Sequence, residues 1–229
     1  MELMLQLGKI KPNARILDIG CGAAYQCSLL KSRGYNIVCT DVANGVTYTN
    51  LDVLSDCSHL PSKDNCFDVV YSSHLLEHAQ DKTKALHEMM RVLDPNGNIY
   101  VIVPTWIWKI GQLITYYPIP IARFAKWVLS KEEQDLAMKT EMPKSVGKFK
   151  SLCLKAKRNC FPEVHGTSLS NLEELRSFRI SSWLKLFRSS GLNVTKVVIG
   201  PLYVPSELPL PTINASRLGI CSSIIFALS

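Results

Sequence analysis

The sequence of 229 residues lacks the signatures of several protein classes. Its eight cysteines include no Cys-x-x-Cys pair, so neither a zinc ribbon nor a disulfide framework is indicated, and we expect small core residues in a reducing compartment. No run of about 18 uncharged apolar residues suggests a membrane-spanning helix. Internal repeats are lacking. The first residues have no signal-peptide layout, so we expect a cytoplasmic protein. With 47% hydrophobic and 20% charged residues, the composition suits one globular domain over 1–229.

Strand and helix patterns alternate along most of the chain. Apolar runs predict strands at 15–20, 35–43, 67–73, 98–104, 193–204 and 217–228. Apolar residues at helical spacing predict helices at 23–33, 74–93 and 177–190. This alternation indicates an α/β fold with a doubly wound, mostly parallel sheet that binds its ligand at the carboxyl ends of the strands. The alternation lapses over 105–171, which we interpret as an inserted substrate, lid or membrane-surface segment.

A glycine turn follows the first predicted strand. Gly20 and Gly22 allow the backbone to approach a ligand closely, and the amides at the start of the next helix can bind a carboxylate or phosphate. The dinucleotide fingerprint requires a third glycine where this chain has Tyr25, which argues against a nicotinamide oxidoreductase. Asp41 ends the second predicted strand and can accept hydrogen bonds from ribose hydroxyls. These features favour an adenosine-type ligand.

Five segments of the first half resemble one family in their order and spacing. They are ILDIGCGAA (16–24), TDVA (40–43), DCSHLP (56–61), FDVVYSSHLLEH (67–78) and RVLDPNGNIYVIVP (91–104). Together they resemble the class I S-adenosylmethionine-dependent methyltransferases, specifically the type 11 small-molecule group. The resemblance implies a Rossmann-like, seven-stranded sheet, with a helical insertion after the fifth strand. A looser resemblance to members from glycan and surface-polysaccharide pathways includes His165-Gly166, Phe178, Trp183 and Leu186-Phe187 with Gly191.

The family resemblance also implies how the cofactor is held at its amino-acid end. Gly20, Cys21 and Gly22 would pass under the methionyl part of S-adenosylmethionine. Asp18 would hold the amino group of that part, and Asp41 would bind the ribose.

The same resemblance assigns the adenine end and the side of methyl transfer. Val42 would lie beside the ribose-binding carboxylate, Asp56 would receive the adenine amino group, and the Cys57 amide would face the ring. Ser72 and Ser73 would line the methyl-transfer side. Two alternatives stay open: Asp56 could cap the following turn, and the serines could be N-caps of the helix at 74–93.

Methyl transfer to a hydroxyl requires a group that removes its proton, and histidine is the usual one. His74 follows the two serines at the mouth of the expected site, and His165 could fold back over it; each could instead have a purely structural role. His59, His78 and His87 are interpreted as loop, packing or surface residues. No cluster of carboxylates and histidines at ligand spacing is apparent, so no metal is expected.

The insertion differs from the rest of the chain in its charge and its aromatic content. Residues 104–190 hold 15 Lys and Arg against 7 Asp and Glu, and so carry the basic excess. The aromatic and basic stretch 105–129, broken by Pro118 and Pro120, could be a lid or could lie on the inner membrane surface. The basic run over 144–158 is either a solvated loop or a site for an anionic acceptor. Its aromatics do not interleave with its charges, which disfavours nucleic acid.

The sequence therefore predicts an S-adenosylmethionine-dependent methyltransferase that O-methylates a small-molecule, sugar or lipid-linked acceptor and releases S-adenosylhomocysteine. One alternative is an RNA or protein methyltransferase. A second alternative is a non-catalytic regulatory module that binds an S-adenosyl ligand.

Overall fold

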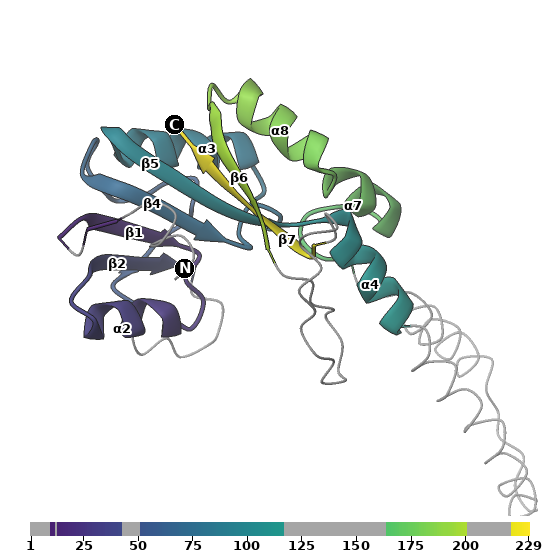
Figure 1. Cartoon of the computed structure of the whole chain (residues 1–229), viewed down its shortest axis with the longest axis horizontal. Helices are drawn as coiled ribbons and strands as arrows, with labels where there is room; N and C mark the ends of the chain where they lie inside the picture. The colour runs from purple at the N-terminus through teal and green to yellow at the C-terminus, as the bar shows by residue number, and fades with distance from the viewer. Residues whose placement is uncertain (1–9, 12, 43–50, 117–163, 201–220) are drawn as a thin grey trace, which may run out of the picture.

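The computed structural model describes residues 10–11, 13–42, 51–116, 164–200 and 221–229 (Figure 1). The basic run over 144–158 lies outside the described residues, as do residues 117–129 of the aromatic segment and the cysteines at 153 and 160. The predictions for those segments therefore stay predictions.

Seven strands form a single sheet. They are β1 (Arg15–Ile19), β2 (Asn36–Asp41), β3 (Val53–Leu54), β4 (Phe67–Ser73), β5 (Leu93–Pro104), β6 (Val194–Ile199) and β7 (Ser223–Leu228). Their order is β3-β2-β1-β4-β5-β7-β6, and only β7 runs antiparallel to its neighbours, which are β5 and β6. The predicted Rossmann-like, mostly parallel α/β sheet is confirmed. Its strand order reverses between β1 and β4, where such sheets bind their ligands.

Helices cover both faces of this sheet. α2 (Tyr25–Ser32) packs on one face, and α3 (Lys82–Val92) and α8 (Ile180–Ser189) pack on the other, whereas α4 (Trp106–Tyr116) and α7 (Asn171–Ser177) lie beyond the end of the sheet (Figure 1). Adjacent residues of β1 point to opposite faces, as they do in any strand. Ile16 therefore packs in one buried cluster with Cys27 of α2, and Leu17 packs in another with Leu86 of α3 and Phe187 of α8. Two buried clusters on opposite faces are what a doubly wound sheet requires.

The helix expected over 74–93 is shorter than predicted. It begins at Lys82, where the Asp81 side chain accepts a hydrogen bond from the Lys84 amide at 2.9 Å and so caps the first turn. The preceding residues form a loop whose apolar members, Leu76 and Ala79, are buried. Leu76 and Ala79 are three residues apart, which is the spacing of residues on one face of a helix, so the sequence pattern predicted a helix there. The prediction of a helical first turn at His74 is wrong, because its φ is +53°.

Other boundaries also differ from the predictions. The helix expected over 177–190 is α8, which begins at Ile180, and the preceding helix α7 was not predicted; the two separate at Phe178 and the extended Arg179. β5 begins at Leu93, earlier than the strand expected over 98–104, and residues 94–97 form an irregularity in its pairing with β4. α4 follows β5 directly, where the helical insertion was expected to begin. In the part of the chain that the structure describes, no helix has the length and apolar character needed to cross a membrane.

Candidate functional site

The loop between β1 and α2 is held against the end of β2. The Gly20 amide donates to the Thr40 carbonyl at 2.8 Å, and the Gly22 amide donates to Asp41 Oδ2 at 2.6 Å. Gly20 has a φ of +76°, and a Cβ there would lie 2.9 Å from Leu75 Cδ1. A side chain at Gly20 would therefore be strained and crowded. The result is a fixed, bare stretch of backbone at the carboxyl edge of the sheet.

A cavity of about 280 Å³ lies over this loop. Its lining includes four residues expected to hold the methionyl part, together with one of the two serines: Asp18, Gly20, Cys21, Gly22 and Ser73. Asp18 is only 4% exposed. Its burial, aided by the charge of Asp41, raises the pKa of this carboxyl from 3.8 to about 7. A buried carboxylate of this kind gains most from a cation, such as a ligand ammonium group.

A second cavity, of about 690 Å³, lies at the ends of β2 and β3. The residues expected at the ribose and adenine line it: Asp41, Val42, Asp56 and Cys57. Asp41 Oδ1 accepts a hydrogen bond from the Val42 amide at 2.6 Å, which fixes the carboxylate. Asp56 Oδ1 accepts from the Ser58 amide at 2.7 Å, and this hydrogen bond lowers the pKa of Asp56. Asp56 therefore does cap the following turn, as the alternative held, while it also lines the cavity.

The two serines at the end of β4 have different surroundings. Ser73 lines the smaller cavity. Ser72 is fully buried and lines neither of the two cavities, and its Oγ has no hydrogen-bond partner among the described residues. The alternative that both serines cap the helix at 74–93 is wrong, since Asp81 caps α3.

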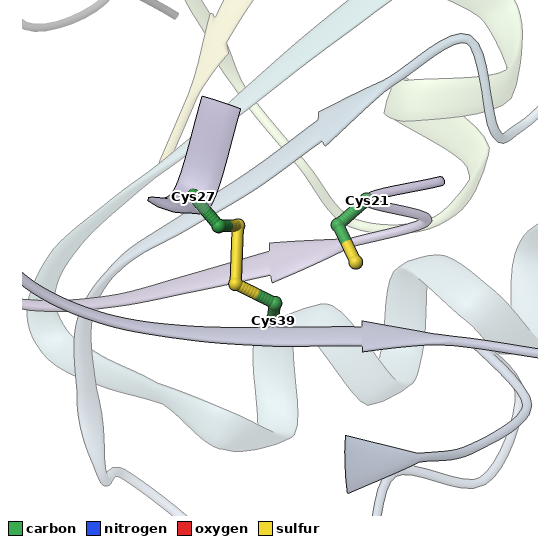
Figure 2. Close-up of side chains that lie close together, drawn as sticks. All are labelled: Cys21, Cys27 and Cys39. Carbon is green, nitrogen blue, oxygen red and sulfur yellow. A yellow bond between two sulfur atoms is a disulfide. The ribbon is translucent and has the colours of Figure 1, made fainter. Parts of the chain in front are cut away.

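Three cysteines lie close together, and one of them, Cys21, belongs to the glycine loop itself (Figure 2). Cys27 of α2 and Cys39 of β2 are joined by a disulfide, so the prediction of unpaired cysteines is wrong for these two. Both are fully buried, as expected of core residues. Cys27 Sγ lies 3.1 Å from Asp18 Oδ2. Burial raises the pKa of the free Cys21 thiol to about 12, so this thiol is neutral and a poor nucleophile.

The loop after β4 and the segment before α7 bring several histidines together. His74 Nδ1 lies 3.1 Å from Glu77 Oε1. The His165 ring lies 4.5 Å from that of His78 and 4.8 Å from that of Trp108, measured between centroids. Burial, and then the nearby His78, lower the pKa of His165. His165 thus folds back against the loop that carries His74, and neither histidine is among the residues that line the two cavities.

A further group of potential ligands was missed in the sequence. A carboxylate oxygen of Glu77 and one ring nitrogen each from His78 and His165 all lie within 4.8 Å of one another. The prediction that carboxylates and histidines do not gather at ligand spacing is therefore wrong. His78 was interpreted as a packing residue of a helix, but it lies in a loop and is exposed. Only the fold of residues 164–167 onto this loop completes the group.

A glycine makes this close approach possible. Gly166 has a φ of +84°, and a Cβ there would lie 2.2 Å from the Glu77 carbonyl oxygen. The next amide, of Thr167, donates to that same carbonyl at 3.0 Å. Lys82 Nζ donates to Thr167 Oγ1 at 2.9 Å. Position 166 therefore requires glycine, because only a residue without a side chain lets this segment approach Glu77 closely enough to place His165 beside His78.

A buried ion pair supports the same segment. Lys109 Nζ lies 2.6 Å from Glu174 Oε2, and both side chains are fully buried. The other Glu174 oxygen accepts a hydrogen bond from the His165 amide at 3.0 Å. Lys109 was expected on a basic edge that could face a membrane; it instead joins α4 to α7, and its neighbour Trp108 is also buried. Sequence patterns do not reveal such a pair, because its members are 65 residues apart.

Comparison with known proteins agrees with this geometry. Residues 17–101 match a family model described as a methyltransferase domain. This region of the chain is similar to class I S-adenosylmethionine-dependent methyltransferases. The chain is 31% identical over 109 residues to malonyl-[acyl-carrier protein] O-methyltransferase of Serratia marcescens, a match covering 43% of this chain and 41% of the relative. It is 33% identical over 97 residues to demethylmenaquinone methyltransferase of Corynebacterium glutamicum, covering 40% and 42%. The chain thus spans less than half the length of these relatives.

Solved methyltransferase structures are similar to this chain in fold. An S-adenosylmethionine-dependent methyltransferase from Mesorhizobium loti superposes with a TM-score of 0.54 at 13% identity, covering 99% of this chain and 96% of that chain. Another, from Thermotoga maritima, gives a TM-score of 0.54 at 18% identity, covering 98% and 86%. At these identities, the likeness establishes the Rossmann-like architecture alone.

Proposed function

We propose that this chain transfers a methyl group from S-adenosylmethionine to a small-molecule acceptor and releases S-adenosylhomocysteine. One observation carries the proposal: a glycine-lined cavity at the strand-order reversal contains the buried Asp18 carboxyl, and Asp41 closes the loop beside it. The chemistry of these groups fits the cofactor, because Asp18 suits an ammonium group and Asp41 suits paired hydroxyls. The two cavities, about 280 and 690 Å³, are of the size that small-molecule ligands occupy.

The two cavities would bind different parts of the cofactor. Asp18 and the backbone of 20–22 would hold the methionyl part. Asp41, with Val42 beside it, would hold the ribose, and Asp56 with the Cys57 amide would receive the adenine. Ser73 faces the smaller cavity and is the serine that we place on the methyl-transfer side, whereas Ser72 belongs to the buried sheet.

The bound cofactor supplies an electrophilic methyl group on a positively charged sulfur. The chain must align an acceptor with that methyl group, exclude water and receive the acceptor's proton. We assign the proton to the imidazole of His74 or of His165. His74 is oriented by its contact with Glu77, which is the usual arrangement of a base and its orienting carboxylate. His165 is the other imidazole proposed as the base.

The acceptor is proposed to be a hydroxyl group of a small molecule, a sugar or a lipid-linked compound. The two relatives support a small-molecule acceptor only broadly, since their names give different methyl acceptors. Trp106 and Ile114 of α4 are exposed, by 43% and 66%, and support the further proposal of contact with a membrane surface. The basic run at 144–158 suggests an anionic acceptor.

Calorimetric titration with S-adenosylmethionine, S-adenosylhomocysteine and NAD tests the cofactor first. Micromolar binding of both adenosyl ligands, without binding of NAD, is the expected result. Binding of NAD alone would overturn the proposal. Transfer of a labelled methyl group to small hydroxyl compounds then tests the reaction. Transfer to RNA or protein instead, or cofactor binding without transfer to any acceptor class, would favour the alternative enzyme or the regulatory module.

A further inference from the structure

The group formed by Glu77, His78 and His165 has the composition of a metal site. It offers one carboxylate oxygen and two imidazole nitrogens, all within 4.8 Å of one another. Bonds of about 2 Å to a shared zinc ion would bring such atoms to about 3–4 Å apart. Small side-chain rotations can close that difference, since His78 is exposed and His165 only half-buried.

The carboxylate of Glu77 has an unused oxygen. The side chain is fully buried, and its Oε2 has no hydrogen-bond partner among the described residues. Its Oε1 is held by His74 at 3.1 Å. A buried carboxylate oxygen without a partner is costly, and a cation would satisfy it. The contact between His74 and Glu77 is the kind of outer hydrogen bond that orients a metal ligand.

The backbone positions the third ligand independently of any ion. Gly166 lets its segment touch the Glu77 carbonyl, and Glu174 Oε1 accepts from the His165 amide at 3.0 Å. The nearby charge of Lys109 is balanced by Glu174, at 2.6 Å. Lys82 also lies near Glu77, but its ammonium group donates to Thr167 at 2.9 Å. The fold thus presents a carboxylate and two imidazoles on one side, with their positions largely fixed beforehand.

We propose that Glu77, His78 and His165 bind a divalent transition-metal ion, with Zn²⁺ as the ion that suits these ligands best. Two histidines and one glutamate form a ligand set that zinc uses in catalytic sites, where an exchangeable position stays open. Iron(II) is also held by two histidines and one carboxylate in some enzymes, but nitrogen and oxygen ligands generally bind iron(II) and manganese(II) less tightly than Zn²⁺. The exposed side of His78 leaves that open position accessible to solvent.

The metal site lies at the border of the larger cavity, because His78 is one of its lining residues. A metal ion there would bind an acceptor oxygen and favour its deprotonated form. This use of the ion rests on the proposed methyl transfer; the binding of the ion does not. In this arrangement His165 is a metal ligand, so His74 is the histidine that receives the acceptor's proton.

Metal binding is tested directly, without an activity assay. The metal-free protein, with its disulfide intact, is titrated with ZnCl₂ by calorimetry and with CoCl₂ by absorption spectroscopy. We expect one bound ion per chain and a cobalt spectrum without a sulfur charge-transfer band. H78A and H165A should weaken binding by at least about a hundredfold, since even outer partners contribute about 10–100-fold. H74A should weaken binding by about tenfold. H87A, which changes an exposed histidine of α3, should bind as the wild type does.

Several results would overturn the metal site. These are absence of saturable binding by the wild type, unchanged affinity in both H78A and H165A, or a sulfur charge-transfer band that places the ion on the cysteines around Cys21. E77Q keeps the shape of the buried side chain and should also lose the metal, with circular dichroism as the check on its fold. Binding of S-adenosylmethionine by the metal-free protein is measured in parallel. Its loss would count against the proposed function, whereas loss of metal binding alone would count against the metal site.

Discussion

Replacement of Asp18 by Asn should change how the stability of the protein depends on pH. Asp18 is 4% exposed, and burial raises its pKa from 3.8 to about 7. The folded state therefore binds this proton more tightly than the unfolded state, so the carboxyl group lowers stability as pH rises from about 4 to about 7. Above pH 7 the effect is constant. D18N removes this group and should be increasingly more stable than the wild type over that interval.

The size of the effect follows from the two pKa values. A shift of about three units, at about 1.4 kcal/mol each, amounts to about 4 kcal/mol over the full range. Between pH 5 and pH 8, the free energy of unfolding of D18N relative to the wild type should rise by about 2.5 kcal/mol. Urea unfolding at these pH values measures this as a shift in midpoint of about 1 M. D68N is the matched control.

The control substitution should change the free energy of unfolding in the opposite direction. A hydrogen bond from Arg15 lowers the pKa of Asp68, so D68N should be less stable by an amount that barely changes between pH 5 and 8. A flat difference for D18N over this interval would refute the reasoning that Asp18 is buried without an adequate partner. Under the proposed function, D18N should also bind S-adenosylmethionine weakly. Wild-type affinity should fall about tenfold per pH unit below pH 7, as the carboxyl becomes protonated.

The remaining predictions concern four other features. G166A should lower the free energy of unfolding by more than the roughly 1–3 kcal/mol that a positive φ costs, because its Cβ would lie 2.2 Å from a carbonyl oxygen. G191A, at a φ of +83° with open space around it, should lower the free energy of unfolding by the conformational cost alone. Equal losses of the two variants in chemical denaturation would contradict the close approach. Reductant should lower stability by about 3 kcal/mol by opening the disulfide loop, and C39S should not respond to reductant; an equal response would show that another group is involved. D41A should weaken S-adenosylmethionine binding by about 1–3 kcal/mol, measured by calorimetry, and unchanged affinity would remove Asp41 from the site. If the membrane contact exists, the protein should bind anionic vesicles more tightly than cationic vesicles in a sedimentation assay. A protein that does not sediment with anionic vesicles at low salt would refute the membrane contact.

The fold and the glycine loop after β1 were largely predictable, because both depend on short stretches of sequence. The apolar run before Gly20 and the acid at the end of the next strand are local patterns, and parallel strands place them at one edge. The helix over 74–93 was overextended for the same reason. Leu76 and Ala79 are buried as helix residues would be, but they reach the core from a loop. Periodicity alone does not separate these two cases.

The sequence by itself determined the α/β sheet, the bare glycine turn and the carboxylates beside it, since each follows from neighbouring residues. Tertiary structure alone decided which distant side chains meet. It joined Cys27 to Cys39, buried Lys109 against Glu174, and brought His165 to Glu77 and His78. The physical reason is that such contacts depend on packing between separate elements, and one close backbone approach at Gly166 fixes the last of them.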